Sequence, residues 1–87
     1  MKVEKVIHIN ESHSIEIGKS TWDSSEQSLR NRYDQQNGKF DPKSSSEIPR
    51  NDLILIIRES INNDLLTGAE LVETLEIIIN KLKRIIS

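Results

Sequence analysis

The chain has 87 residues, a formal net charge of −2 and no cysteine. Its length predicts one small domain, residues 1–87, with a limited core because short chains bury a small share of their surface. The missing cysteines exclude disulfides and thiolate metal sites, and the acidic balance argues against a general nucleic-acid-binding protein. Association with another chain is the remaining way to gain burial.

Charges near the start of the chain and short apolar runs predict a cytoplasmic protein without a membrane partner. The opening MKVEKVIHIN carries charges at Lys2, Glu4 and Lys5 and lacks the apolar stretch of a signal peptide. The longest apolar runs, Leu53–Ile57 and Ile77–Ile79, are far shorter than the roughly 20 residues of a membrane span.

Residues 1–20 have the alternating pattern of a β-hairpin. Over residues 3–9 the alternation places four side chains on one side of the first strand: Val3, Lys5, Ile7 and Ile9. Ile15 and Ile17 share one face of the second strand, and turn-forming residues 10–13 lie between the strands. A two-stranded hairpin is barely stable in water, so it must pack on helices, gain a third strand or pair with a second chain.

Residues 21–47 form a polar segment for which two structures compete. In the first, the capping-box spacing of Asp23 and Glu26 begins a short helix at Ser24. Apolar residues in this segment are too sparse to give such a helix a buried stripe. We therefore favour the second, extended alternative.

In the extended alternative, the segment holds a second short hairpin. Residues 28–33 form a strand, the Asn37-Gly38 pair specifies the turn, and residues 39–40 return. Pro42 then ends the strand, and residues 43–47 form a loop.

The C-terminal part, residues 49–87, predicts two antiparallel helices. Pro49 suits the first turn of a helix, and Asp52 then lies near the positive end of the helix dipole. Apolar residues go most of the way round residues 53–61, so we expect this helix to be covered on several sides. Residues 62–64 break it, and Thr67 and Glu70 form a capping box for the second helix.

The second helix carries a regular apolar seam. Five residues are spaced four, three, four and three apart: Leu71, Leu75, Ile78, Leu82 and Ile85. This is an a/d pattern over about two heptads, with a second apolar row at Val72, Ile79 and Ile86. Such a face fits either an ordinary amphipathic helix against the sheet of the same chain or a homo-oligomer interface. We expect a homo-oligomer.

No residue pattern in the chain points to catalysis. The only histidines, His8 and His13, belong to a strand and its turn, where no nucleophile pattern accompanies them. Together with Glu11 they match no standard metal site. The three glycines are scattered, so no phosphate-binding glycine loop is present. We predict a protein that is not an enzyme and has no metal or cofactor.

The order of a strand followed by two helices resembles the ribbon-helix-helix layout of DNA-binding dimers. The resemblance is in order only, because this chain has two strands, a long polar insert and little positive charge. A small DNA-binding regulator is therefore a minor alternative, and we do not expect nucleic acid as a partner.

One window collects the residues that suit an anionic ligand. Arg30 and Arg32 share a strand face, and their guanidiniums repel unless an anion or a carboxylate lies between them. All three aromatic residues lie nearby, and three serines precede the expected helix start, where anions bind well. The candidate ligand-binding residues are Trp22, Arg30, Arg32, Tyr33, Lys39, Ser44, Ser45 and Ser46.

The same window also fits a solvated polar loop in which the arginines pair with Asp34, Glu26 or Glu47. Three functions follow from these alternatives. The first is a non-enzymatic oligomer that captures a phosphate-bearing small molecule, such as a nucleotide signal, as sequestering or inhibitory proteins of phages and mobile elements do. The second is a protein-interaction module that inhibits or adapts a larger host protein. The third is the DNA-binding regulator.

Overall fold

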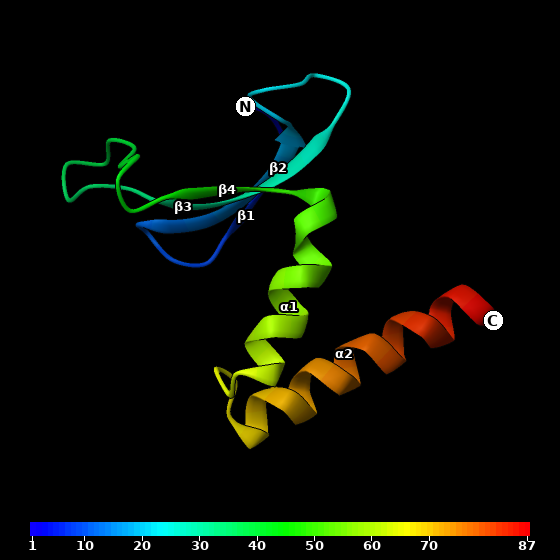
Figure 1. Cartoon of the computed structure of the whole chain (residues 1–87). Coiled ribbons are helices and arrows are strands. Elements are labelled where there is room, and N and C mark those ends of the chain that lie inside the picture. The colour runs from blue at the N-terminus through cyan, green and yellow to red at the C-terminus, as the bar shows by residue number, and fades with distance from the viewer. The chain divides into compact units, whose positions relative to one another are not determined.

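A four-stranded antiparallel sheet followed by two helices makes this an α+β protein, which confirms the expected fold class (Figure 1). The structure is a computed structural model that describes all 87 residues. The strands are β1 (Lys2–His8), β2 (His13–Lys19), β3 (Gln27–Tyr33) and β4 (Ser46–Pro49). A 3-10 turn, η1 (Arg50–Asp52), leads into helices α1 (Leu53–Asn62) and α2 (Gly68–Ile86).

The chain divides into two compact units near the start of α1. Met1–Leu53 forms the sheet unit, and Ile54–Ser87 forms the helical unit. The predicted boundary at residue 49 lies close to this division. The single domain expected for residues 1–87 stays a prediction.

The strands follow one another in the sheet in chain order, β1-β2-β3-β4, each antiparallel to the next. The predicted N-terminal hairpin is confirmed as β1 and β2, with residues 9–12 as its turn. The third strand that such a hairpin needs is β3, and β4 extends the sheet by one more strand.

A bulge in β1 overturns one detail of the predicted alternation. Val3 pairs with Gly18 and Lys5 pairs with Ile17, so the register shifts between Val3 and Lys5. Neighbouring residues of β2 point to opposite faces, and so Val3 and Lys5 lie on opposite faces rather than on one. Gly18 makes the shift possible, because a Cβ there would come within 2.0 Å of the Lys2 carbonyl oxygen.

The extended alternative for residues 21–40 is confirmed in β3, and the helix at Ser24 is wrong. Asp23 instead forms a turn, in which its carboxylate accepts hydrogen bonds from the Ser25 amide and hydroxyl. The Asn37-Gly38 turn is present, with Gly38 at φ 83°. The return strand is shorter than predicted, since only Phe40 pairs, as an isolated bridge to Asp34.

The second hairpin is completed by β4, whose first two residues belong to the predicted loop 43–47. Ser46 pairs with Asn31 and Glu47 with Arg30, so these two residues are strand and not loop. Serine and glutamate have low strand propensity, and for that reason the segment gave no strand signal. Pro49 is the last residue of β4 and precedes η1, with ψ 142°, so it is not in the first turn of a helix.

Within the helical unit, the predicted capping box at the start of α2 is confirmed. The Thr67 hydroxyl accepts a hydrogen bond from the Glu70 amide, and the Glu70 carboxylate accepts one from the Thr67 amide. The break after α1 is also present, with Asp64 in the left-handed region at φ 59°. The two helices diverge from this turn in an open V (Figure 1).

The buried side chains of the chain are polar. Those with less than 9% of their surface exposed are Ser14, Glu16, Ser20 and Ser28, and no large apolar side chain reaches that level. Every buried side-chain nitrogen and oxygen has a hydrogen-bond partner. Within the helical unit, Ile54, Leu55, Ile56 and Ile57 of α1 are all exposed, and the covering expected around α1 stays a prediction. Neither helix is long and apolar enough to cross a membrane.

We expect the substitution Gly18→Ala to lower the free energy of unfolding by about 1–3 kcal/mol, because the added methyl group collides with backbone atoms of β1. Urea unfolding followed by circular dichroism measures this loss. Gly68→Ala is the matched control, since its Cβ would meet nothing within 4 Å, and it should change stability by no more than about 1 kcal/mol. Equal effects of the two substitutions would contradict the bulge.

Candidate functional site

The residues of β2 and β3 that point to one side of the sheet form its polar face. Cross-strand partners share a face, and the pairs Ser14–Arg32, Glu16–Arg30 and Gly18–Ser28 lie on this one. Ile15, Ile17, Leu29 and Ile48 lie on the other, apolar face, where they are half-buried. The predicted placement of Arg30 and Arg32 on one face is therefore confirmed.

Glu16 lies between the two guanidiniums. Its Oε1 accepts from Nε of Arg30 at 2.7 Å and is 2.7 Å from Nη2, while its Oε2 is 3.3 Å from Nη1 of Arg32. Only 5% of the Glu16 side chain is exposed, against 16% and 28% for the two arginines. The carboxylate is thus the partner that two adjacent guanidiniums require.

Phe40 and Asp34 complete what we call the arginine cluster: Glu16, Arg30, Arg32, Asp34 and Phe40. The guanidinium carbons of Arg30 and Arg32 lie 4.8 and 4.9 Å from the centre of the Phe40 ring. Nε of Arg32 donates to Asp34 at 2.9 Å. This bond, with Glu16 and against the effect of burial, raises the pKa of Arg32 above its ordinary value.

The arginine cluster is electrically balanced, with two guanidiniums and two carboxylates. Of the three carboxylates suggested as partners, Asp34 is one, whereas Glu26 and Glu47 are not. Sequence reasoning missed Glu16 because it lies in a different strand, and only the β2–β3 register brings it opposite Arg30. The sequence signal that could have identified Glu16 is its place as a charged residue between two isoleucines of an alternating strand.

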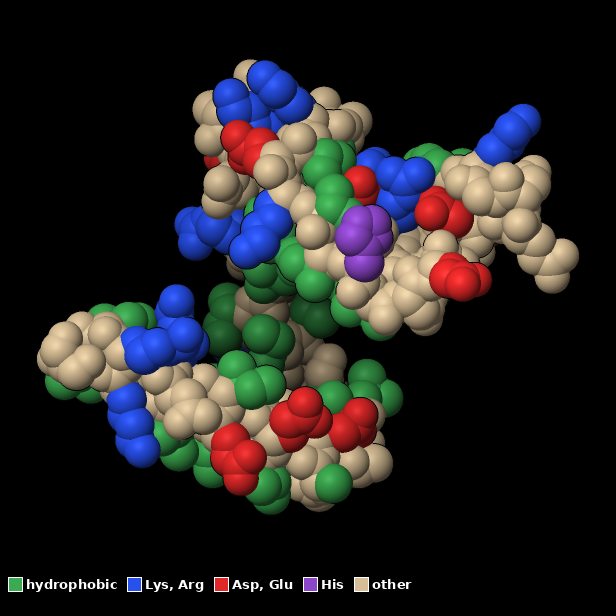
Figure 2. Space-filling model, turned by 180° about the vertical axis from the view of Figure 1, so that it is seen from behind, with side chains coloured by type: hydrophobic (Ala, Val, Ile, Leu, Met, Phe, Trp, Pro, Cys, Tyr) green, Lys and Arg blue, Asp and Glu red, His purple; other side chains and the backbone are tan.

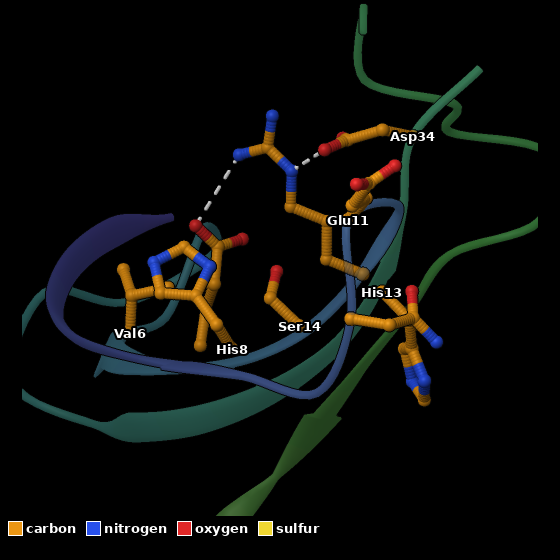
Figure 3. A pocket seen from close by; sticks show the side chains of 9 residues that line it. Val6, His8, Glu11, His13, Ser14 and Asp34 are labelled. Carbon is orange, nitrogen blue, oxygen red and sulfur yellow. Dashed lines mark hydrogen bonds and ion pairs between the residues drawn. The ribbon is translucent and has the colours of Figure 1, made fainter. Parts of the chain in front are cut away.

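A shallow pocket of about 290 Å³ lies beside this cluster at the end of the β1–β2 hairpin (Figure 3). Arg32 and Asp34 line it, together with His8, Ser14 and the turn. Figure 3 shows the contacts of Arg32 with both of its carboxylates as dashed lines. No three histidine or carboxylate side chains lie close enough together to hold a metal ion.

The other predicted ligand-binding residues do not gather around the arginines. Trp22 is 55% exposed in the β2–β3 connection. Tyr33 lies on the apolar face and stacks on His13, with ring centres 4.3 Å apart. Lys39 is in the turn after β3, where its amide donates to Asn37. Of the three aromatic residues, only Phe40 contacts the guanidiniums.

Two of the three serines form hydrogen bonds within the connection between β3 and β4, and the third belongs to β4. Ser44 donates to the Asp41 carboxylate, and Ser45 donates to the Asp41 carbonyl and accepts from the Tyr33 amide. Ser46 belongs to β4, and the first turn of helix follows only at Arg50. The three serines therefore do not lie at the start of a helix.

Glu47 ties β4 to the β2–β3 connection. Its two carboxylate oxygens accept from the Thr21 amide at 3.0 Å and the Thr21 hydroxyl at 2.6 Å. Burial raises the pKa of Glu47, but these hydrogen bonds, another from Ser28 and the N-terminal ammonium outweigh burial and place the pKa below its ordinary value.

The helical unit presents a wide apolar surface. All five seam residues are exposed, from 39% at Leu71 to 67% at Ile85, as is the flanking row Val72, Ile79 and Ile86. The helices also form a groove of about 380 Å³, lined mainly by Ile56, Ile57, Ile77 and Ile78. Figure 2 shows hydrophobic side chains at many places on the surface of this unit.

Comparison of the chain with protein-family models, with curated proteins and with solved structures finds no significant match. The two surfaces that the structure offers, the arginine cluster with its pocket and the apolar surface of the helical unit, are therefore the basis for a function.

We expect Glu16→Gln to lower the free energy of unfolding by about 2–3 kcal/mol, because two guanidiniums then lose their shared carboxylate and face each other. Urea unfolding of the two proteins measures the difference. Glu26→Gln is the control, since Glu26 is exposed and its side chain has no partner. A loss no larger than that of the control would show that the cluster contributes little to folding.

The depressed pKa of Glu47 makes stability depend on pH. The folded protein binds the proton more weakly than the unfolded chain, so Glu47 stabilises the fold above its ordinary pKa of 4.5. That contribution is lost as pH falls from there through the lower pKa of the folded state. Unfolding free energies of the wild type and Glu47→Gln, measured between neutral and acidic pH, should converge as pH falls. If the difference between the two unfolding free energies does not change with pH, the Glu47 carboxylate is not the source of the pH dependence.

Proposed function

We propose that this chain is a non-enzymatic protein-binding module, which associates with another protein chain through its helical unit. The observation that carries the proposal is the exposure of large aliphatic side chains all along α1 and α2. Contiguous apolar surface on a folded chain is the usual mark of an interaction site. The pattern of the seam supports a helical partner, since a/d spacing fits the grooves of a facing helix.

The size of the apolar surface suits association, provided that more than the seam is covered. Burying a large aliphatic side chain fully contributes about 1.5–3 kcal/mol. The five seam residues are about half exposed, so covering them contributes roughly 4–7 kcal/mol per chain. Association costs about 4–15 kcal/mol, so the flanking row and α1 must contribute as well.

The arginine cluster supports protein binding over phosphate capture. Both guanidiniums already have carboxylate partners, so a phosphate would have to compete with Glu16 and Asp34 for them. Phosphate capture by residues 22–46 stays a prediction, as does the DNA-binding alternative. In the proposed module, the cluster stiffens the sheet unit.

The substitution Leu75→Asp tests the module. A charge in the middle of the seam should abolish association, while the sheet unit stays folded and the midpoint of urea unfolding of a dilute sample changes little. Sedimentation and circular dichroism give the two readouts. Asn80→Asp is the matched control, since it adds the same charge to an exposed position of α2 outside the seam.

Two outcomes would contradict the proposal. One is a Leu75→Asp chain that associates as the wild type does. The other is a wild type that stays monomeric and is destabilised by Leu75→Asp by about 2 kcal/mol or more in dilute solution. The second result would mean that the seam is covered within the chain.

A further inference from the structure

The pocket beside the arginine cluster has a small side chain, Ser14, at its floor. His8, Ser14 and Arg32 lie opposite one another on β1, β2 and β3, so all three point to the polar face of the sheet. A short side chain between two long ones leaves a hollow above it. Asn10 and Glu11, from the turn between β1 and β2, line the same hollow. The strand register and the hairpin turn therefore create this pocket together.

The Ser14 hydroxyl faces the pocket without a hydrogen-bond partner in the chain. Only 8% of Ser14 is exposed, and the other buried polar side chains, Glu16, Ser20 and Ser28, all form hydrogen bonds. Side-chain oxygens that are fully enclosed all have partners, so the exposed part of Ser14 includes its hydroxyl. Figure 3 shows this oxygen pointing away from the strand, to the side on which Asp34 lies. A ligand bond would satisfy the hydroxyl.

The carboxylates of the pocket also have unused acceptor positions. Asp34 binds Arg32 through Oδ1, which leaves its Oδ2 without a partner. The exposed Glu11 carboxylate forms no hydrogen bond or ion pair in the chain. Oε2 of Glu16 has only the 3.3 Å contact with Arg32. One charged donor, Nη2 of Arg32, is also without a partner, so the balance of charge decides which ligand fits.

The charges around the pocket favour a cation. The arginine cluster is balanced, and Glu11 adds one carboxylate, so with neutral histidines the negative charges are in excess. A bound cation removes this excess, whereas a bound anion increases it. A metal ion lacks its ligands here, because no three histidine or carboxylate side chains lie close enough together. The cation that fits is therefore an organic one with N–H donors.

We propose that this pocket binds a primary ammonium group on a short alkyl chain. The N–H donors of an ammonium match the acceptors on Ser14, Asp34 and Glu11. Val6, the aliphatic residue of the lining, offers a surface to the alkyl chain. The volume of about 290 Å³ is at the lower end for ligand pockets and suits a small amine or a single lysine side chain. The site lies in the sheet unit and does not depend on association through the helical unit.

Titration of the isotope-labelled full chain with n-butylamine at neutral pH, followed by NMR, tests this site. The amide signals of residues 8–14 should shift and saturate with a Kd of about 1–10 mM, a range open to so small a ligand. A second titration uses Nα-acetyl-lysine amide. Equal binding assigns the site to a lysine side chain of a partner protein, and binding of n-butylamine alone assigns it to a small free amine.

Two analogues of similar length test whether the charge is recognised. Neutral n-butanol and anionic butyrate should each bind at least about tenfold more weakly than n-butylamine, because hydrogen bonds to a charged group are the stronger ones. An alcohol that binds as tightly as the amine would overturn the ammonium. Tighter binding of butyrate would overturn it as well, and would mean that Arg32 dominates the site.

The variant Ser14→Ala tests the hydroxyl, which has no other contact to lose, so the sheet should stay folded. It should weaken n-butylamine binding about tenfold, the effect of one hydrogen bond to a charged group. Ser24→Ala is the matched control, since it removes an exposed hydroxyl of the β2–β3 connection and should leave the Kd unchanged. The proposal fails if Ser14→Ala binds as the wild type does, or if about 100 mM n-butylamine shifts no signal of residues 8–14.

Discussion

The carboxylate of Glu16 is the contact on which the sheet unit depends. It lies between two guanidiniums on the middle strands and is almost fully buried. Around it, the buried positions of β2 and β3 hold serine and glycine in place of leucine or isoleucine. The interior of this unit is therefore held by hydrogen bonds and ion pairs. Such contacts fix geometry well, but they contribute less net free energy than their number suggests.

A polar interior has a consequence for the rest of the chain. Small proteins gain most of their stability from apolar burial, and this chain keeps its large aliphatic side chains mainly in α1 and α2. Within the helical unit those side chains are exposed. The residues that would normally form a core are thus available to a partner, which is the physical basis of the proposed module.

The sequence predicted best where a local rule decides the structure. Alternating isoleucines specified β2, the Asn37-Gly38 pair specified a turn, and the capping box at Thr67 fixed the start of α2. It predicted least where the structure depends on a partner strand. The residues of β4 have almost no strand propensity of their own, and β4 is stabilised by its backbone pairing with β3.

In the candidate site, too, the features set by local rules were predictable and those set by strand pairing were not. That Arg30 and Arg32 share a face follows from the period of a strand, and the need for a carboxylate between them follows from their charge. The identity of that carboxylate depends on the β2–β3 register, which no local pattern in either strand reveals. The aromatic residues, close in sequence, were separated for a related reason: Tyr33 follows the alternation of β3 to the apolar face, whereas Phe40 returns across the polar face.

Folding of the helices is thermodynamically coupled to the proposed association with a partner. Helices shorter than about 12–15 residues are marginal in water, and most helical stability in proteins comes from packing an apolar face. α1 has 10 residues and α2 has 19, and a capping box closes the start of α2. A capping box contributes only about 0.5–2 kcal/mol. Since the diverging helices offer each other little cover, a partner that packs on the seam stabilises the helical state as well as the complex. The exposed seam and the shortness of the helices therefore both support the proposed association with a second chain.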